Sequence, residues 1–170
     1  MERFQHVVRL GVFGHTHKDY FEVGKSMTNI HNPIMVNSIG GGLTTYGGCN
    51  PSFKVMEMDA KTLLPLKITN YYADLGKANS EGTSPEWVPL LDYTSKYDMK
   101  DLSPSSYIDL ANQLKDDQDM MDEFWKYARK TPSKADIETN DEDEEDGGIS
   151  NGLSGYCRLV TTETHEKRYC

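Results

Sequence analysis

The sequence has no long apolar run and no cluster of basic residues. A membrane-spanning helix needs about 20 consecutive apolar residues, and no stretch of this 170-residue chain approaches that length. Lysine and arginine together number 18, against 27 acidic residues, which gives a formal net charge of -9. Nucleic acids and anionic lipid surfaces attract clustered Lys and Arg. We therefore expect no transmembrane segment and no nucleic-acid partner.

A signal-peptide pattern is also absent from the first residues. His6 and Arg9 interrupt the apolar residues at the start of the chain, and no small-residue cleavage site follows them. This absence fits an intracellular protein, or a chain whose true start lies upstream.

Cysteine is scarce, with three residues in the chain. Cys157 and Cys170 bracket the last segment, and a disulfide between them would close a short loop of the kind found in oxidising compartments. Cys49 lies in a glycine-rich stretch and would be left over. Free thiols in a cytosolic protein are the alternative, and composition alone leaves both interpretations open.

The negative charge is concentrated in the run from Asp136 to Asp146. Segments with many charges and almost no apolar residues cannot form a packed core. We expect residues 131–150 to be an acidic disordered linker, followed by a cysteine-containing tail at 151–170. A calcium-binding loop is disfavoured because the carboxylates lack the spaced glycine that such a loop uses for its turn.

The first 75 residues have the pattern of short strands separated by glycine-rich loops. A short helix from Phe4 should run into a strand that ends at Phe13. Apolar alternation predicts further strands at 19–23, 33–37, 53–59 and 66–72. The last two are close enough in sequence to form an antiparallel hairpin.

Apolar residues at helical spacing predominate after Asp74. The pattern from Trp87 to Tyr93 predicts a short amphipathic helix. Ser103 followed by Pro104 is typical of a helix start, and one helix should continue from there to Arg129-Lys130. Its apolar stripe is expected to face the core rather than a partner or a membrane. The stripe comprises Tyr107, Leu110, Ala111, Leu114, Met121, Phe124, Trp125 and Ala128.

The segment Gly14-His15-Thr16-His17 has the clearest chemical signature. Two histidines one residue apart, on a turn that leaves an apolar strand, can direct their imidazoles to one side or to two adjacent ions. Neutral imidazole is a good ligand for zinc, iron or manganese. A bare His-x-His pair is often incidental, so the residues alone leave metal binding open.

Several blocks resemble the acid sphingomyelinase branch of the calcineurin-like metallophosphoesterases. The resemblance covers roughly residues 3 to 130 and extends weakly into the cysteine tail. It implies that the true start of the chain lies upstream. The matching blocks are Arg3–Phe21, which contains Gly-His-Thr-His, then Leu43–Tyr46, Asn50–Val55, Pro85–Trp87 and Phe124–Tyr127.

The resemblance implies an α/β fold. Residues 1–75 would be the C-terminal portion of a metallophosphoesterase β-sandwich flanked by helices, and residues 76–130 a small helical C-terminal module. In this family two metal ions, expected here to be Zn²⁺, activate a bridging water that attacks phosphorus. His15 and His17 would each bind one ion.

The family's other metal ligands come from motifs that this sequence does not contain. The chain has no Asp-x-His, no Gly-Asp and no Asn-His sequence. Two imidazoles cannot replace the missing bridging carboxylate. We therefore expect the chain to be a fragment that is inactive by itself.

The resemblance also suggests roles for residues around the histidines. Tyr46 would contact the phosphate or head group, with a buried tyrosine at a strand end as the alternative. Asp19 would orient a ligand histidine from behind, or belong to an ordinary turn. Lys54 replaces the family's arginine, and a structural role is expected for it. Cys157 and Cys170 are similar to the family's disulfide-bearing tail, which carries more cysteines.

The family's activity implies a parent protein that hydrolyses sphingomyelin to ceramide and phosphocholine. Its partner would be a phosphodiester substrate, expected to be a phospholipid, with peripheral membrane contact. Its location would be secreted, or lysosomal in an acidic vesicle. The alternatives are a nucleotide phosphodiesterase or phosphatase, an endopolyphosphatase of the same branch, or a non-catalytic binding module if the chain is complete.

Overall fold

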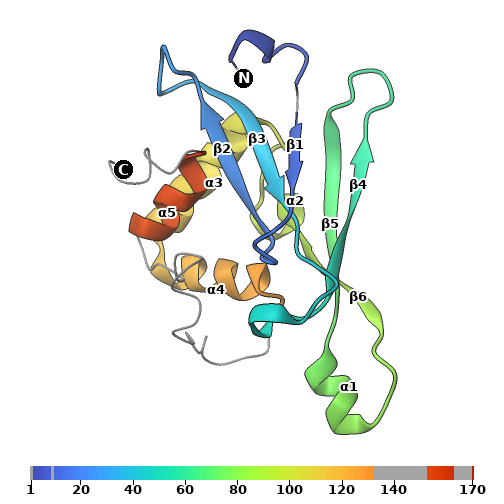
Figure 1. Cartoon of the computed structure of the whole chain (residues 1–170). Coiled ribbons are helices and arrows are strands. Elements are labelled where there is room, and N and C mark those ends of the chain that lie inside the picture. Colours follow the sequence, from blue (N-terminus) through green and yellow to red (C-terminus); the bar gives the residue numbers. More distant parts are fainter. Residues whose placement is uncertain (1, 9, 132–152, 163–169) are drawn as a thin grey trace.

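The described residues form two three-stranded sheets, with the longer helices beside the first and a shorter one at the end of the second (Figure 1). A computed structural model describes residues 2–8, 10–131, 153–162 and 170. In the first sheet the order is β1 (Leu10–Phe13), β3 (Pro33–Ile39), β2 (Tyr20–Lys25). β1 is parallel to β3, and β2 is antiparallel to it. The mixed α/β class and these three strands are confirmed.

The second sheet is antiparallel and contains β4 (Ser52–Met58), β5 (Pro65–Ala73) and β6 (Trp87–Asp92) in that order. β4 and β5 form the predicted hairpin, with Phe53 opposite Tyr71. Their rings stack 5.2 Å apart. Aromatic cross-strand pairs of this kind stabilise a sheet register.

The prediction of a helix from Trp87 to Tyr93 is wrong. Trp87–Asp92 is strand β6, and only the following residues turn into the short helix α2 (Tyr93–Lys96). Pro89 explains the error, because it has no N–H for a helical hydrogen bond but is tolerated in an edge strand. Asp92 then caps α2 by accepting a hydrogen bond from the Thr94 N–H.

The single long helix predicted after Ser103 is two helices, α3 (Pro104–Asp116) and α4 (Gln118–Ala128). Ser103 caps α3 and Pro104 opens it, as expected. Asp117 breaks the continuity, with an extended backbone at φ -126° and ψ 101° and a side chain that accepts from the Met120 N–H. An aspartate that caps a following turn competes with helix continuation.

Helix α1 (Leu75–Glu81) was not predicted, nor was α5 (Leu153–Val160) in the tail. At the N-terminus, the expected helix is reduced to the 3-10 turn η1 (Glu2–Phe4), and β1 begins only at Leu10. The Cys157–Cys170 disulfide is present, with Cα atoms 5.7 Å apart, and Cys49 is a buried free thiol. The predicted acidic linker lies outside the described residues apart from Thr131.

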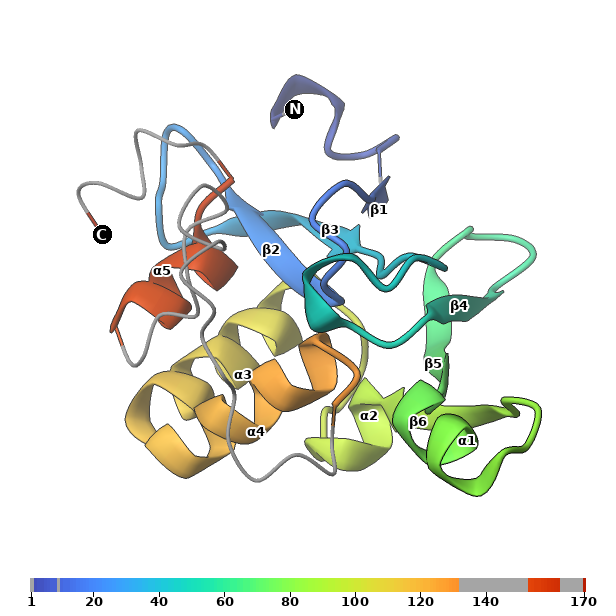
Figure 2. The same ribbon diagram turned by 60° about the horizontal axis from the view of Figure 1, so that its bottom comes forward.

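One core joins the strand-rich segment to the helices. The predicted apolar stripe is buried throughout, with every member at most 3% exposed. α3 and α5 contact β2, and α3 also contacts β3, so these two helices lie against one face of the first sheet (Figure 2). Phe21 of β2 packs against Tyr93, Tyr107 and Phe124. Burial of these rings contributes to the apolar area that fixes the helices on the sheet.

Within the described part of the chain, no helix is both long enough and apolar enough to cross a bilayer.

The start of α3 makes stability dependent on pH. Asp101 accepts from the Ser103 N–H at 2.9 Å and the Ser106 hydroxyl at 2.6 Å. Hydrogen bonding from the side chains of Ser103 and Ser106, together with the Ser103 N–H, lowers the pKa of Asp101 to about 2. Because the folded-state pKa is below the unfolded value, the stabilisation is present above about pH 4 and is lost as the pH falls towards about 2. Asp101→Asn should therefore destabilise the chain at pH 7, and its difference from wild type should shrink as the pH falls through about 2.

Urea unfolding of both proteins across this range measures the effect. Asp98→Asn, on a neighbouring exposed carboxylate, is the control. A difference between wild type and Asp101→Asn that is independent of pH would contradict the assignment.

Candidate metal-binding site

The histidine turn, residues Gly14–His17, leaves the C-terminal end of β1. Because β1 is parallel to β3, the loop that follows β3 begins at the same edge of the sheet. The two loops are joined where the Gly40 N–H donates to the Phe13 carbonyl at 2.7 Å. Loops at the carboxyl ends of parallel strands are the usual place for sites in α/β folds.

Both histidines have left-handed backbone conformations, with φ of 82° at His15 and 57° at His17. A non-glycine residue in this region is strained by about 1–2 kcal/mol, although histidine tolerates it better than most residues. His15 is exposed and His17 is partly buried. Strain of this kind persists only where surrounding contacts hold the backbone.

Tyr46 lies beside His17. It begins the 3-10 turn η2 (Tyr46–Gly48), and its ring meets the His17 imidazole edge to face, with centroids 5.5 Å apart. A Cβ on Gly42 would lie 3.6 Å from the His17 ring, so the glycine loop passes close to it. Tyr46 is 74% exposed, which rules out the alternative of a buried tyrosine at a strand end. The structure thus brings two of the predicted site residues together.

Asp19 lies two residues after the turn and is only 2% exposed. Its carboxylate pairs with the Lys54 ammonium at 2.9 Å. Lys54 also donates to the Ser38 hydroxyl at 2.7 Å and the Ile39 carbonyl at 2.9 Å. The lysine therefore connects the histidine turn to β3 from its position in β4, which is a structural role.

Lys130 is a contact that the sequence analysis missed. It follows α4 and is fully buried, and its ammonium donates to the His17 carbonyl. Burial lowers the pKa of Lys130. In the sequence, Lys130 is a basic residue at the end of a predicted helix. A favourable interaction with the helix dipole already accounts for a lysine there. Nothing in that pattern indicated a neighbour 113 residues away.

The residues present fit part of a metal centre. Two imidazoles on one turn are suitable ligands for zinc. The described residues contain no group of three or more His, Cys, Asp or Glu side chains placed to hold one ion. Further ligands would have to come from outside the described part of the chain.

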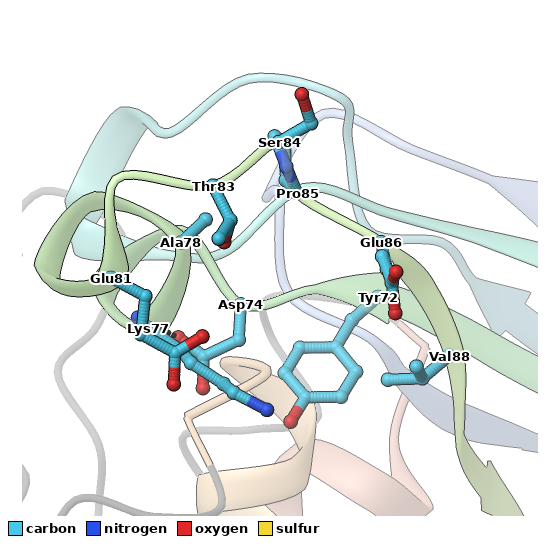
Figure 3. A pocket seen from close by; sticks show the side chains of 10 residues that line it. All are labelled: Tyr72, Asp74, Lys77, Ala78, Glu81, Thr83, Ser84, Pro85, Glu86 and Val88. Atoms are coloured by element: carbon cyan, nitrogen blue, oxygen red, sulfur yellow. Dashed lines mark hydrogen bonds between the residues drawn. The ribbon is translucent and has the colours of Figure 1, made fainter.

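The cavity drawn in Figure 3 lies elsewhere, between α1 and the segment that leads into β6. It has a volume of about 280 Å³, and none of the predicted site residues lines it. Tyr72 and Asp74 form part of its wall, and Asp74 caps α1 through the Lys77 N–H. Burial raises the pKa of Tyr72.

The buried ion pair under the turn should be sensitive to loss of one partner. Lys54→Met would leave the Asp19 carboxylate buried without its cation, which costs about 3 kcal/mol or more. Lys67→Met is the matched control, because Lys67 pairs with Asp92 at 3.5 Å while its side chain is 47% exposed. Such surface pairs contribute less than about 1 kcal/mol.

Chemical denaturation at pH 7 compares the two variants. Adding Asp19→Asn to Lys54→Met should recover part of the loss. If Lys54→Met and Lys67→Met lower the free energy of unfolding by the same small amount, the buried pair contributes no more to stability than the surface pair.

A family model described as the acid sphingomyelin phosphodiesterase C-terminal region matches residues 34–131. Sphingomyelin phosphodiesterase 2 of Caenorhabditis elegans is 33% identical over 119 residues, which is 67% of this chain and 19% of the relative. Sphingomyelin phosphodiesterase of Bos taurus is 29% identical over 129 residues, 74% of this chain and 21% of the relative.

Another relative is named cyclic GMP-AMP phosphodiesterase SMPDL3A, from Bos taurus. It is 27% identical over 117 residues, 66% of this chain and 26% of the relative. The aligned part of the chain spans about a fifth to a quarter of these relatives. Since the family model covers more than half of the 170 residues, the chain belongs to the acid sphingomyelinase-like family, matching its C-terminal region.

Proposed function

We propose that this chain is the C-terminal part of a zinc-dependent phosphodiesterase, in which His15 and His17 each bind one of two zinc ions. The observation that carries the proposal is the histidine turn at the carboxyl end of β1, whose strained backbone carries two imidazoles, with that of His17 beside Tyr46. The two sheets would belong to a metallophosphoesterase β-sandwich completed by other parts of the protein.

Each residue then has a distinct task. Zinc, when bound, lowers the pKa of a water molecule and offsets negative charge on the phosphate. His15 and His17 supply neutral nitrogen ligands from a fixed turn. Tyr46, exposed at the rim, contacts the phosphate or head group. Asp19, just after the turn, is held by its ion pair with Lys54 and helps to orient a ligand histidine.

The surface around β1 supports the idea that a longer protein completes the site. Among the described residues, β1 is an edge strand that pairs with β3 alone. Its side chains Val12 and Phe13 are 65% and 50% exposed. Unpaired edges with exposed apolar side chains invite association. Further strands and metal ligands in the longer protein would cover this edge.

The proposed substrate is sphingomyelin, cleaved to ceramide and phosphocholine, because several relatives carry that activity in their names. Access to a lipid substrate would require peripheral contact with a membrane. The Cys157–Cys170 disulfide favours an oxidising compartment, and we propose a secreted or lysosomal location. A nucleotide phosphodiester is the second candidate, supported by the relative named for cyclic GMP-AMP.

Histidine substitutions in the longer parent protein test the metal assignment. His15→Ala and His17→Ala should each lower zinc content and reduce turnover by about 100-fold or more, since each removes a zinc ligand. His31→Ala is the control, because His31 is an exposed histidine in the β2–β3 loop. Zinc analysis and hydrolysis of sphingomyelin and cyclic GMP-AMP, assayed in parallel, provide the measurements.

Wild-type turnover in either variant would overturn the assignment of that histidine. If the wild-type parent hydrolyses cyclic GMP-AMP faster than sphingomyelin, the metal assignment still holds. The proposed substrate is then a nucleotide phosphodiester.

A further inference from the structure

The end of α4 makes two contacts with the segment His17–Asp19, at the end of the histidine turn and just after it. The Asp19 N–H donates to the Ala128 carbonyl at 2.9 Å, and the Lys130 ammonium donates to the His17 carbonyl. Residues 17 to 19 are therefore fixed by the segment that ends the helical part of the chain. This contact joins positions more than 100 residues apart.

Lys130 is itself held in place from several sides. Its backbone is left-handed, at φ 58°, and its carbonyl accepts from the Asn50 side chain at 2.8 Å. Asn50 in turn accepts from the Leu75 N–H at 3.2 Å. Gly41 leaves room for the ammonium, since a Cβ there would lie 2.7 Å from Lys130 Nζ. The surroundings thus fit a lysine that points at the turn.

We infer that Lys130 is a positioning residue, which fixes the left-handed backbone of His17 and so aims its imidazole. A charged donor forms a stronger hydrogen bond to a carbonyl than a neutral one, and at His17 it restrains the peptide plane between residues 17 and 18. The consequence for metal binding rests on the proposed function, whereas the effect on the His17 backbone does not.

A merely structural lysine would have a different signature. If Lys130 only filled space, its removal would lower stability. It would change the histidine turn no more than a cavity elsewhere in the core. Leu114→Ala provides that comparison, because Leu114 is fully buried in α3 and a cavity there should destabilise the fold.

The first test follows the metal-free chain by NMR, using the amide and Cα shifts of His17 and the imidazole shifts of His15 and His17. Lys130→Met should move the His17 backbone shifts away from left-handed values, and Leu114→Ala should leave them unchanged. Unmoved His17 shifts in a folded Lys130→Met chain would overturn the inference.

A pair of glycine variants retains the lysine. Gly41→Ala places a methyl group against Ser52 Oγ and 2.7 Å from Lys130 Nζ, whereas Gly40→Ala meets only the Phe13 carbonyl at 3.5 Å. Gly41→Ala should reproduce the His17 shifts of Lys130→Met, and Gly40→Ala should match wild type. Equal shifts in the two glycine variants would contradict the role of Lys130, even if Lys130→Met failed to fold.

The second test adds Zn²⁺ to the same samples and follows the imidazole resonances. Loss of a residue that orients a ligand typically weakens metal affinity by 10- to 100-fold, so Lys130→Met should need about tenfold more zinc than wild type or Leu114→Ala. If Lys130→Met differs from wild type in its His17 backbone shifts but binds zinc with the same affinity, Lys130 does not aim the imidazole. If zinc does not shift the imidazole resonances of the wild-type chain, the proposed metal site is contradicted. The positioning role of Lys130 is then tested by the His17 backbone shifts alone.

Discussion

The candidate site depends on how the backbone from His17 to Asp19 is held. Two histidines with positive φ are strained, so the turn keeps its shape only through contacts made elsewhere. Lys54 holds the Asp19 carboxylate, Ala128 accepts from the Asp19 N–H, and Lys130 donates to the His17 carbonyl. Two of these three supports come from the end of α4. The helices are therefore part of what shapes the site.

The burial of the helices against the first sheet makes this arrangement possible. Phe21 of β2 meets rings from α2, α3 and α4, and Tyr20 meets Trp125 at 5.8 Å. This aromatic core fixes where α4 ends relative to β2, which follows directly after the histidine turn. A buried lysine can then be placed with precision, because its ammonium needs a partner at a defined position.

Local patterns in the sequence predicted much of the fold. The β4–β5 hairpin follows from alternation, and the buried stripe of α3 and α4 follows from helical spacing. The pattern was misleading where one residue overrode the periodicity. Asp117 capped a new helix inside the stripe, and Pro89 favoured an edge strand over a helix. The histidine motif was visible because His-x-His is local, whereas Lys130 was hidden because its partner is distant in sequence. Tyr46 could be placed near the site by resemblance, but its exposure and its contact with His17 required coordinates.

The central proposal is that the described residues bring two imidazoles, and no group of three or more His, Cys, Asp or Glu side chains, to a site completed by a longer protein. X-ray absorption at the zinc edge of the purified chain, loaded with zinc at millimolar concentration, tests this directly. The account predicts a first shell of no more than two imidazole nitrogens near 2.0 Å, completed by water oxygens. A sulfur shell near 2.3 Å, or a third protein ligand, would show that the chain completes a metal site by itself and would contradict the account.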